Sequence, residues 1–361
     1  MKIVLVAGGS GGHIYPALEL AKTFKEYGHE ILFIGNKNRM EATIIPDLGY
    51  DFFAIDNSSL QGSFAKKINS LLLMHDSYTD SLEKLKSYGA DCVIGFGNYV
   101  TVPVILAAKR LKIKTVIHEQ NSIVGSANKL LSKVVDKVVV SYQSTLVKMP
   151  KKKSYYYGNP RSSAFKDLKY DRKILKKYGL KPDLKTVLIF MGSLGSKVIN
   201  DFMLEALKNF RKKDYQVLYV TGKNYYQDFI TKFNETNNVK VLSYANTNEL
   251  LNNIDILVSR AGATTIAEIT AIGITSLLIP SPYVVANHQY YNASNLVEKN
   301  AAVLLSEEDL TQKSFIDKID EMIANDKYAQ SLAENAKALS KIDSAELIYQ
   351  LVIDLVGESN E

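Results

Sequence analysis

IVLVAGGSGGH, at residues 3–13, is the stretch that decides the fold, because an apolar run there breaks directly into glycines. Such a run is typical of a buried parallel strand, and the glycines allow a tight turn into a following helix. The first N–H groups of that helix have no intrahelical partner, and they lie at the positive end of the helix dipole. The stretch therefore predicts a strand, a loop and a helix start that binds an anion.

The same pattern occurs again at residues 187–195, which read VLIFMGSLG. Either loop alone is more often a tight turn than a phosphate cradle. The first loop is not G-x-G-x-x-G, and no acidic residue closes the next apolar run at residues 31–34. No Walker lysine follows either loop, so hydride transfer and kinase chemistry are both disfavoured. Two such loops predict two α/β domains.

The composition sets the broad class of protein. A chain of 361 residues is long enough for two domains of roughly 150 to 200 residues. The single cysteine and the absence of a signal-like start predict a cytoplasmic protein, and no apolar stretch approaches the roughly 18 to 20 residues of a membrane span. A net charge of +6 favours anionic partners without choosing among nucleic acid, lipid head groups and a nucleotide.

Short β-branched runs alternate with amphipathic segments along the chain, which predicts parallel sheets covered by helices on both faces. We expect strands at 3–7, 30–35, 91–95, 114–118, 136–141, 186–191, 215–221, 238–243, 254–259, 275–280 and 301–305. Helices are expected at 16–28, 78–88, 101–111, 198–211, 225–234, 264–272, 288–298 and 313–325. The alternation restarts after residues 158–160, which predicts domains at 1–160 and 161–340, with a helix and tail at 341–361 that pack back on the first domain.

Polar clusters follow several of these strands, where ligands of open α/β sheets bind. In the first half they are residues 95–99 and 118–121, and in the second half residues 259–265 and 287–293. Glu268 follows the third of these clusters and is able to accept two hydrogen bonds from a ribose diol. The alternative is that Glu268 complements the helix dipole while Thr264 and Thr265 cap the helix, and both interpretations stay open.

Taken in order, these motifs resemble those of the lipid I N-acetylglucosaminyltransferases of peptidoglycan synthesis. The motifs are GGSGGH at 8–13, GFGNYV at 95–100, HEQN at 118–121, GNPR at 158–161, GSLG at 192–195, RAG at 260–262 with Glu268, and QYYNA at 289–293. The resemblance implies the GT-B fold, with two Rossmann-like domains whose parallel sheets face a central cleft. The implied reaction moves GlcNAc from UDP-GlcNAc to the C4 hydroxyl of MurNAc in undecaprenyl-diphospho-MurNAc-pentapeptide, inverting to a β-1,4 linkage.

The resemblance also implies roles for individual residues. His13 is the first candidate for the general base and Glu119 the second, because a histidine pKa near 6.5 suits a base at neutral pH. Implied donor contacts are Ser10, Gly11, Gly12, Asn121, Arg161, Gly192, Ser193, Asn200, Arg260, Gly262, Ala263, Thr264, Glu268 and Gln289. Implied acceptor contacts are Gly97, Tyr99 and Asn128. Met191, Asn98 and His288 depart from the family pattern, the first two from glycine and the third from glutamine.

The resemblance further implies partners and a location. No D-x-D motif is present to hold a divalent ion, and we expect neither metal nor cofactor. UDP-GlcNAc, lipid I, an anionic membrane surface and proteins of cell-wall synthesis and division are the expected partners, with no nucleic acid. The expected location is the cytoplasmic face of the membrane, as a peripheral protein. Phe64, Ile68, Leu71 and Leu72 share one helical face beside Lys66 and Lys67, which fits either a membrane-docking helix or a helix that faces the core.

Other functions remain open. A UDP-GlcNAc 2-epimerase would pair two similar domains around the same nucleotide sugar. A GT-B transferase acting on another lipid acceptor, such as diacylglycerol, would share the donor half. A sensor without catalysis would bind UDP-GlcNAc without turnover.

Overall fold

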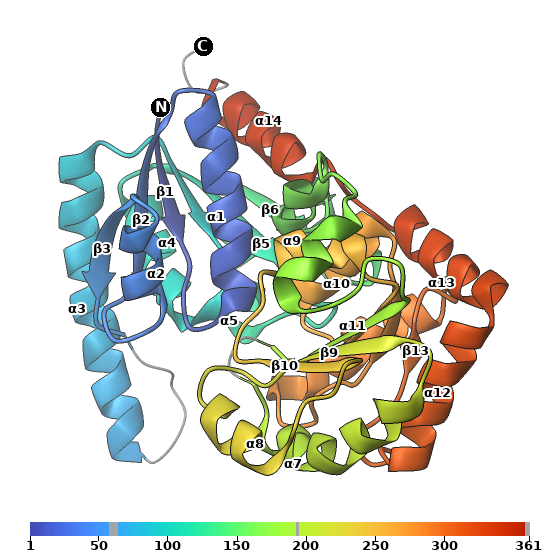
Figure 1. Cartoon of the computed structure of the whole chain (residues 1–361). Coiled ribbons are helices and arrows are strands. Elements are labelled where there is room, and N and C mark those ends of the chain that lie inside the picture. Colours follow the sequence, from blue (N-terminus) through green and yellow to red (C-terminus); the bar gives the residue numbers. More distant parts are fainter. Residues whose placement is uncertain (58–63, 193–194, 358–361) are drawn as a thin grey trace. The chain divides into compact units, whose positions relative to one another are not determined.

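The computed structural model describes residues 1–57, 64–192 and 195–357, with side chains left undescribed at 64–69 (Figure 1). It divides into two units. Unit 1 comprises Met1–Ser163 and Lys341–Glu361, and unit 2 comprises Ala164–Ser340. The chain thus leaves the first unit three residues beyond the expected boundary and returns to it at Lys341. Each unit is built on its own parallel sheet.

The sheet of unit 1 has the strand order β3-β2-β1-β4-β5-β6-β7, and all its neighbouring strands are parallel. The order reverses between β1 and β4, and ligands of open α/β sheets bind at such a reversal. The strands are β1 (Lys2–Val6), β2 (Glu30–Asn36), β3 (Asp51–Ile55), β4 (Cys92–Gly95), β5 (Lys114–Glu119), β6 (Lys137–Val140) and β7 (Ser154–Tyr156).

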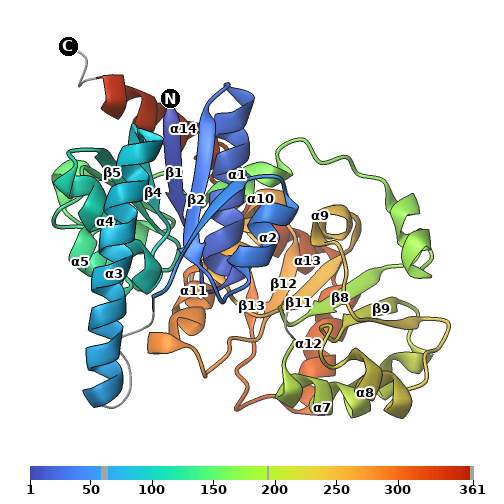
Figure 2. The same cartoon turned by 90° about the vertical axis from the view of Figure 1, so that its left-hand side faces the viewer.

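Helices cover both faces of this sheet because the side chains of each strand alternate between the faces. Ile3 and Leu5 of β1 pack in a cluster with α1 and α14, whereas Val4 and Val6 pack in a second cluster with α4. Figure 2 shows α3 and α4 together on one side of β1 and β2, with α1 on the other. The helices are α1 (Gly11–Glu26), α2 (Glu41–Asp47), α3 (Phe64–Tyr88), α4 (Asn98–Arg110), α5 (Ser126–Leu131), α6 (Gln143–Leu146) and α14 (Ser344–Gly357).

The C-terminal helix α14 belongs to unit 1 although its sequence follows unit 2. Ile348 and Val352 are buried in the same cluster as Phe24 of α1. Tyr349 stacks on Tyr27 with ring centroids 4.2 Å apart, and the Tyr27 hydroxyl donates to Glu346 at 3.0 Å. These contacts attach the end of the chain to the helix that follows the first glycine loop.

The sheet of unit 2 has the strand order β10-β9-β8-β11-β12-β13, with its reversal between β8 and β11. Its strands are β8 (Thr186–Phe190), β9 (Gln216–Val220), β10 (Val239–Leu242), β11 (Ile256–Ser259), β12 (Thr275–Leu278) and β13 (Val303–Leu304). Its helices are α7 (Lys197–Ala206), α8 (Tyr226–Lys232), α9 (Thr247–Leu250), α10 (Ala263–Ile272), α11 (His288–Val297), α12 (Gln312–Ala324) and α13 (Asp326–Ala338).

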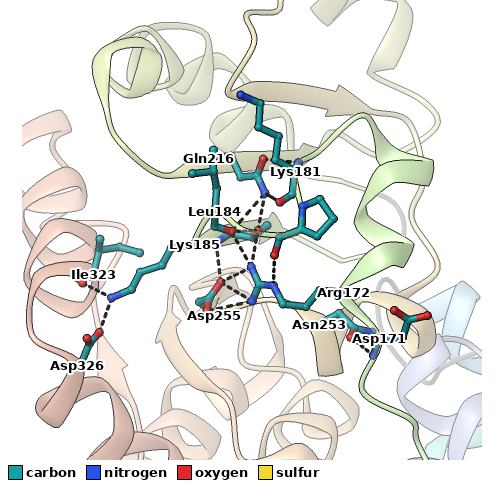
Figure 3. Close-up of polar contacts among 12 residues, drawn as sticks. Asp171, Arg172, Lys181, Leu184, Lys185, Gln216, Asn253, Asp255, Ile323 and Asp326 are labelled. Atoms are coloured by element: carbon teal, nitrogen blue, oxygen red, sulfur yellow. Dashed lines mark hydrogen bonds and ion pairs between the residues drawn. The ribbon is translucent and has the colours of Figure 1, made fainter.

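A polar network at the amino ends of these strands fixes the segment that enters unit 2 (Figure 3). The Arg172 guanidinium donates to the Asp255 carboxylate at 3.0 to 3.2 Å and to the Leu184 carbonyl at 2.6 Å. Asp255 also accepts the Thr186 N–H, at 2.7 Å, where β8 begins. Gln216 Nε2 donates to the Thr186 hydroxyl at 2.9 Å. This network lies at the opposite end of the strands from the predicted ligand loops, so its role is structural.

Candidate functional site

The first glycine loop connects β1 to α1, and the side chains of Glu41, which is buried, and Asn98, which is half-buried, hydrogen-bond to it. The Glu41 carboxylate accepts the N–H groups of Gly9 and Asn36, both at 3.1 Å. Asn98 Nδ2 donates to the Gly8 carbonyl at 3.0 Å. A Cβ atom on Gly8 would lie 2.2 Å from Glu41 Oε1, and Gly9 has a φ of 84°. Glycine is therefore required here by the packing of the loop as well as by any ligand.

The first turn of α1 brings together four residues with expected site roles. Gly11 and Gly12 begin the helix, so their N–H groups are among those without intrahelical acceptors. Ser10 precedes them, and its Oγ lies 3.0 Å from His13 Nδ1. Ser10 is exposed and His13 is half-buried. The start of α1 thus lies beside an imidazole whose ring is oriented by a hydroxyl.

Glu119, at the end of β5, is only 2% exposed and organises the loop that follows. Its carboxylate accepts the N–H of Asn121 at 3.1 Å, the N–H of Gly125 at 2.9 Å and Asn128 Nδ2 at 2.9 Å. Burial raises the pKa of Glu119, while the hydrogen bonds from these donors act in the opposite direction. The carboxylate is thus engaged in holding residues 119–128.

Polar side chains from β5 and α5 meet beneath this loop. His118 Nε2 lies 2.8 Å from the Gly158 carbonyl, and burial lowers the pKa of His118 to about 4, so the ring is neutral at pH 7. Gln120 Nε2 donates to the Phe96 carbonyl at 3.0 Å. Among the described residues, His118 Nδ1, Gln120 Oε1 and Asn128 Oδ1 have no hydrogen-bond partner. Such buried acceptors require donors from water or from a ligand.

The start of α4 places Gly97 near this group, and Tyr99 follows it in the first turn of the helix. Gly97 has a φ of 80°, and a Cβ atom there would lie 3.2 Å from Asn128 Nδ2. Tyr99 is half-buried, and its N–H donates to Asn98 Oδ1 at 2.6 Å. Asn98 has a φ of 68°, in the left-handed region that asparagine tolerates better than most residues. The departure from glycine at Asn98 therefore keeps a backbone conformation that glycine adopts easily.

Arg161 and Asn121, two of the expected donor contacts, belong to unit 1. Arg161 is 8% exposed, and its guanidinium carbon lies 5.7 Å from the centre of the Tyr15 ring. The Arg161 N–H donates to Asn159 Oδ1 at 3.0 Å. The Asn121 carbonyl accepts the Thr145 hydroxyl at 3.0 Å. Contacts within unit 1 thus fix both residues, which lie beyond the carboxyl ends of its strands.

The second glycine loop connects β8 to α7 in unit 2. Gly192 and Gly195 have φ values of 91° and 74°, and a Cβ atom on Gly195 would lie 2.1 Å from the Thr221 carbonyl oxygen. The predicted diphosphate contact Ser193 lies outside the described residues. Asn200 Nδ2 donates to the Thr221 carbonyl at 3.1 Å, and Asn200 Oδ1 accepts the Tyr219 hydroxyl at 2.5 Å. The Asn200 side chain therefore joins α7 to the end of β9.

The next loop at the carboxyl ends of the unit 2 strands connects β11 to α10. Gly262 is the N-cap of α10, and Ala263 and Thr264 form its first turn. Glu268 lies farther along the helix and is 6% exposed. Arg260 precedes the loop, with Nη1 donating to the Ile279 carbonyl at 3.1 Å and Nη2 to the Ser196 hydroxyl at 3.3 Å. The helix start presents small residues, as phosphate binding requires.

A turn with an uncommon backbone conformation precedes α11, whose second residue is Gln289. Gln289 Oε1 accepts the Ser281 N–H at 2.9 Å. Ala286 and Asn287 have φ values of 54° and 49°, an uncommon conformation for residues with a Cβ atom. His288 Nδ1 lies 2.9 Å from the Val285 carbonyl, so this departure from glutamine closes the turn.

Two buried carboxylates contact residues of the loops at the carboxyl ends of the strands, and the local sequence did not predict either contact. Glu41 supports the first glycine loop, and Glu307 forms an ion pair with Arg260. Each lies far along the chain from its partner, in a segment that reads as an ordinary charged surface. The folding of α2 brings Glu41 to the first loop, and the strand order β11-β12-β13 brings Glu307 to Arg260.

Two parallel-sheet units, each with a glycine loop and a helix start at the reversal of its strand order, define a GT-B glycosyltransferase. Residues 3–140 match the glycosyltransferase family 28 N-terminal domain, and residues 186–348 match the C-terminal domain of that family. The chain belongs to the family of UDP-N-acetylglucosamine–N-acetylmuramyl-(pentapeptide) pyrophosphoryl-undecaprenol N-acetylglucosamine transferases. This confirms the resemblance and the predicted fold.

The relatives cover the chain from end to end. The transferase of Bacillus cytotoxicus is 39% identical over 99% of this chain and 100% of its own length. The transferase of Leuconostoc mesenteroides is 37% identical over the same shares. Among solved structures, MurG of Acinetobacter baumannii has a TM-score of 0.79 at 23% identity and covers 98% of this chain and 99% of its own. A UDP-N-acetylglucosamine 2-epimerase has a TM-score of 0.69 at 12% identity, with 100% and 98% covered, so the fold alone is shared.

Proposed function

We propose that this enzyme transfers GlcNAc from UDP-GlcNAc to the C4 hydroxyl of MurNAc in undecaprenyl-diphospho-MurNAc-pentapeptide, giving lipid II and UDP. The observation that carries this conclusion is the match of the whole chain, at 37 to 40% identity, to transferases named for these two substrates. The two loop-bearing sheet edges support it, because a transferase needs one site for a nucleotide donor and one for an acceptor. The 2-epimerase alternative is not favoured by these relatives.

The donor is bound mainly by unit 2 in this proposal. The N–H groups at the start of α10, from Gly262 to Thr264, bind the diphosphate in this proposal, together with the predicted contacts Gly192 and Ser193. The Glu268 carboxylate accepts the ribose hydroxyls, and Gln289 contacts the GlcNAc hydroxyls together with Asn121. Asn200 supports the loop through its contacts with β9 rather than through the ligand.

Charge develops on UDP as the bond between sugar C1 and phosphate breaks. Fixed N–H dipoles and a nearby cation stabilise such a charge without reorganisation, and this is commonly the largest contribution to catalysis. Arg260 is the candidate cation in unit 2, and Ser193 adds a hydroxyl donor. Arg161 supplies a second, nearly buried guanidinium from unit 1.

His13 removes the proton from the acceptor hydroxyl in this proposal. With His13 Nδ1 donating to Ser10 Oγ, the lone pair of Nε2 is the atom that takes the proton. Glu119 fits a different role, because its carboxylate already accepts hydrogen bonds from Asn121, Gly125 and Asn128 within its loop. We therefore assign Glu119 to positioning Asn128, which with Gly97 and Tyr99 forms the acceptor side.

Acceptor-dependent release of UDP tests the proposed reaction. The purified protein is mixed with UDP-GlcNAc and a short-chain lipid I analogue, and UDP and the disaccharide product are measured. We expect UDP only when the acceptor is present. Release of free ManNAc from UDP-GlcNAc alone would replace the transferase by the 2-epimerase, and tight donor binding with neither product would indicate a sensor.

The lipid-linked acceptor implies that the enzyme works at a membrane surface. Among the described residues, no helix combines the length and apolar composition of a membrane span. Exposed apolar side chains lie instead on α3 and around α5, two helices that flank α4, and at the end of α6. They are Leu71, Leu72, Leu130, Val134 and Val147, with exposed lysines at positions 129, 133, 148, 151 and 152.

Liposome binding tests this face as the docking surface. Each lysine near an anionic surface contributes about 1 kcal/mol, which salt weakens. We expect sedimentation with anionic liposomes at low salt, and a clear loss in the Lys129→Glu, Lys133→Glu double variant. A Lys299→Glu, Lys327→Glu variant makes the same charge change at exposed positions of unit 2 and serves as the control. Equal loss of liposome binding in both variants would indicate a general effect of charge. Unchanged binding in the Lys129→Glu, Lys133→Glu variant would show that this face is not the docking surface.

A further inference from the structure

Arg260 ties together four neighbouring strand ends of unit 2. It follows β11, it donates to the Ile279 carbonyl after β12, and it donates to Ser196, which caps the helix after β8. Its Nη2 also forms an ion pair with Glu307, which lies just beyond β13. The side chains of Arg260 and Glu307 are only 10% and 9% exposed. The cation assigned to the donor diphosphate is therefore already paired with a carboxylate of its own unit.

We infer that Glu307 is an internal counter-ion that competes with the UDP diphosphate for Arg260 and thereby promotes release of UDP. This inference rests on the proposed function, because it takes Arg260 as a contact of the donor diphosphate. A group that pairs with the cation before binding must be displaced, or must share the cation with the ligand, and either change weakens ligand binding. Glu307 thus sets donor and product affinity through Arg260.

The chemistry of the reaction makes this competition stronger for the product than for the donor. The bond between C1 and the β-phosphate oxygen breaks, its electron pair stays on that oxygen, and the acceptor oxygen bonds to C1. The acceptor proton goes to the base. UDP therefore leaves with one more negative charge than its phosphates carried in UDP-GlcNAc. A carboxylate beside Arg260 repels UDP more than it repels the donor, so turnover is less inhibited by accumulated product.

Affinity measurements on Glu307→Gln test the sign of this effect. Glutamine keeps the shape of the side chain and removes the charge. We expect UDP to bind about tenfold tighter, within the roughly 5- to 150-fold range typical of coupling between two ligands. UDP-GlcNAc should tighten less, and uridine, which lacks phosphates, should bind unchanged. Product inhibition by UDP should become correspondingly stronger in steady-state kinetics.

Matched variants separate competition from a supporting role. Glu308→Gln removes the same charge one residue away at an exposed position, and UDP affinity should remain within about twofold of wild type, because solvent screens exposed charges. Glu307→Ala should also bind UDP more tightly, which keeps the test available if Glu307→Gln folds poorly. Weaker or unchanged UDP binding in folded Glu307 variants would overturn the inference and make Glu307 a support for Arg260. Absence of UDP binding by the wild-type protein would instead overturn the proposed function.

Discussion

Glu119→Gln distinguishes the two roles open to the buried carboxylate at the end of β5, general base and anchor of the following loop. The carboxylate accepts the Asn121 N–H at one oxygen, and the Gly125 N–H and Asn128 Nδ2 at the other. Glutamine offers one carbonyl oxygen and replaces the other oxygen with an NH₂ group. Its best orientation keeps the bonds from Gly125 and Asn128 and turns its NH₂ toward Asn121, whose N–H and side chain both bond to the carboxylate in the wild type.

The stability cost follows from this geometry. A hydrogen bond to a charged group contributes about 1.5 to 3 kcal/mol, and the variant loses one while leaving a buried donor unpaired. Removing a buried charge offsets part of this loss. We therefore expect the free energy of unfolding in urea at pH 7 to fall by about 1 to 2 kcal/mol.

The effect of pH on stability has a defined sign. Burial raises the pKa of Glu119, so the folded protein binds this proton more tightly than the unfolded chain does. The contribution of Glu119 to stability is therefore greatest below the ordinary glutamate pKa and is lost as the pH rises through the raised value. Relative to Glu119→Gln, the wild type should lose stability across that window as the pH increases.

The activity of Glu119→Gln decides between the two roles. If the residue positions Asn128 and its loop, the KM for the acceptor should rise while the pH profile of kcat keeps the ionisation of the base. UDP affinity should stay close to wild type, since the donor is assigned mainly to unit 2. Loss of that ionisation, with a fall in kcat of about 10²-fold or more and an unchanged acceptor KM, would refute the reasoning and make Glu119 the base.

Three further substitutions test the other assignments. His13→Ala should lower kcat about a hundredfold or more with nearly unchanged UDP affinity, and activity should survive EDTA; near-normal turnover would remove His13 as the base. Glu268→Ala should weaken UDP binding in calorimetry by about 1.5 to 3 kcal/mol, and unchanged binding would return Glu268 to the role of a dipole-complementing residue. Asp255→Ala should lower the free energy of unfolding by about 2 to 4 kcal/mol without changing UDP affinity, because it leaves Arg172 and the Thr186 N–H without their carboxylate. Lys177→Ala, which breaks an exposed pair with Glu249, is the control and should cost less than about 1 kcal/mol; equal losses would contradict the structural role of the network.

The strands of the two sheet centres were predictable because each is a short apolar run buried on both faces. β1, β8 and β11 lie within two residues of their expected ranges. β3 and β7 were missed; both are edge strands of the first sheet, and apart from Ile55 their side chains are exposed or half-buried, so neither is a buried apolar run. The expected helix at 78–88 is the end of α3, which begins at Phe64.

The site was predictable to the extent that it is local in sequence. A strand, its glycine loop and the start of the next helix occupy about a dozen residues, so the pattern alone places Ser10 and His13 at a strand end. The Glu41 bond to Gly9 spans 32 residues and depends on the folding of α2 behind the loop. The pairing of Arg260 with Glu307 depends on the order β11-β12-β13 in the sheet. No local pattern contains that information.

The buried carboxylates of Glu41 and Glu307 reduce the number of free N–H groups and cations with which the two loops could bind an anion. Glu41 accepts the Gly9 N–H, so the predicted anion site of unit 1 is limited to the helix start at Gly11 and Gly12 rather than the whole glycine run. Glu307 forms an ion pair with Arg260, so in our proposal the diphosphate binds beside a cation whose charge is already neutralised. Under our inference the Glu307 pairing lowers the affinity for the diphosphate, while both carboxylates fix the geometry of the groups that they contact. A transferase that must release UDP after each turnover gains from this, because tight binding of the product slows the next cycle.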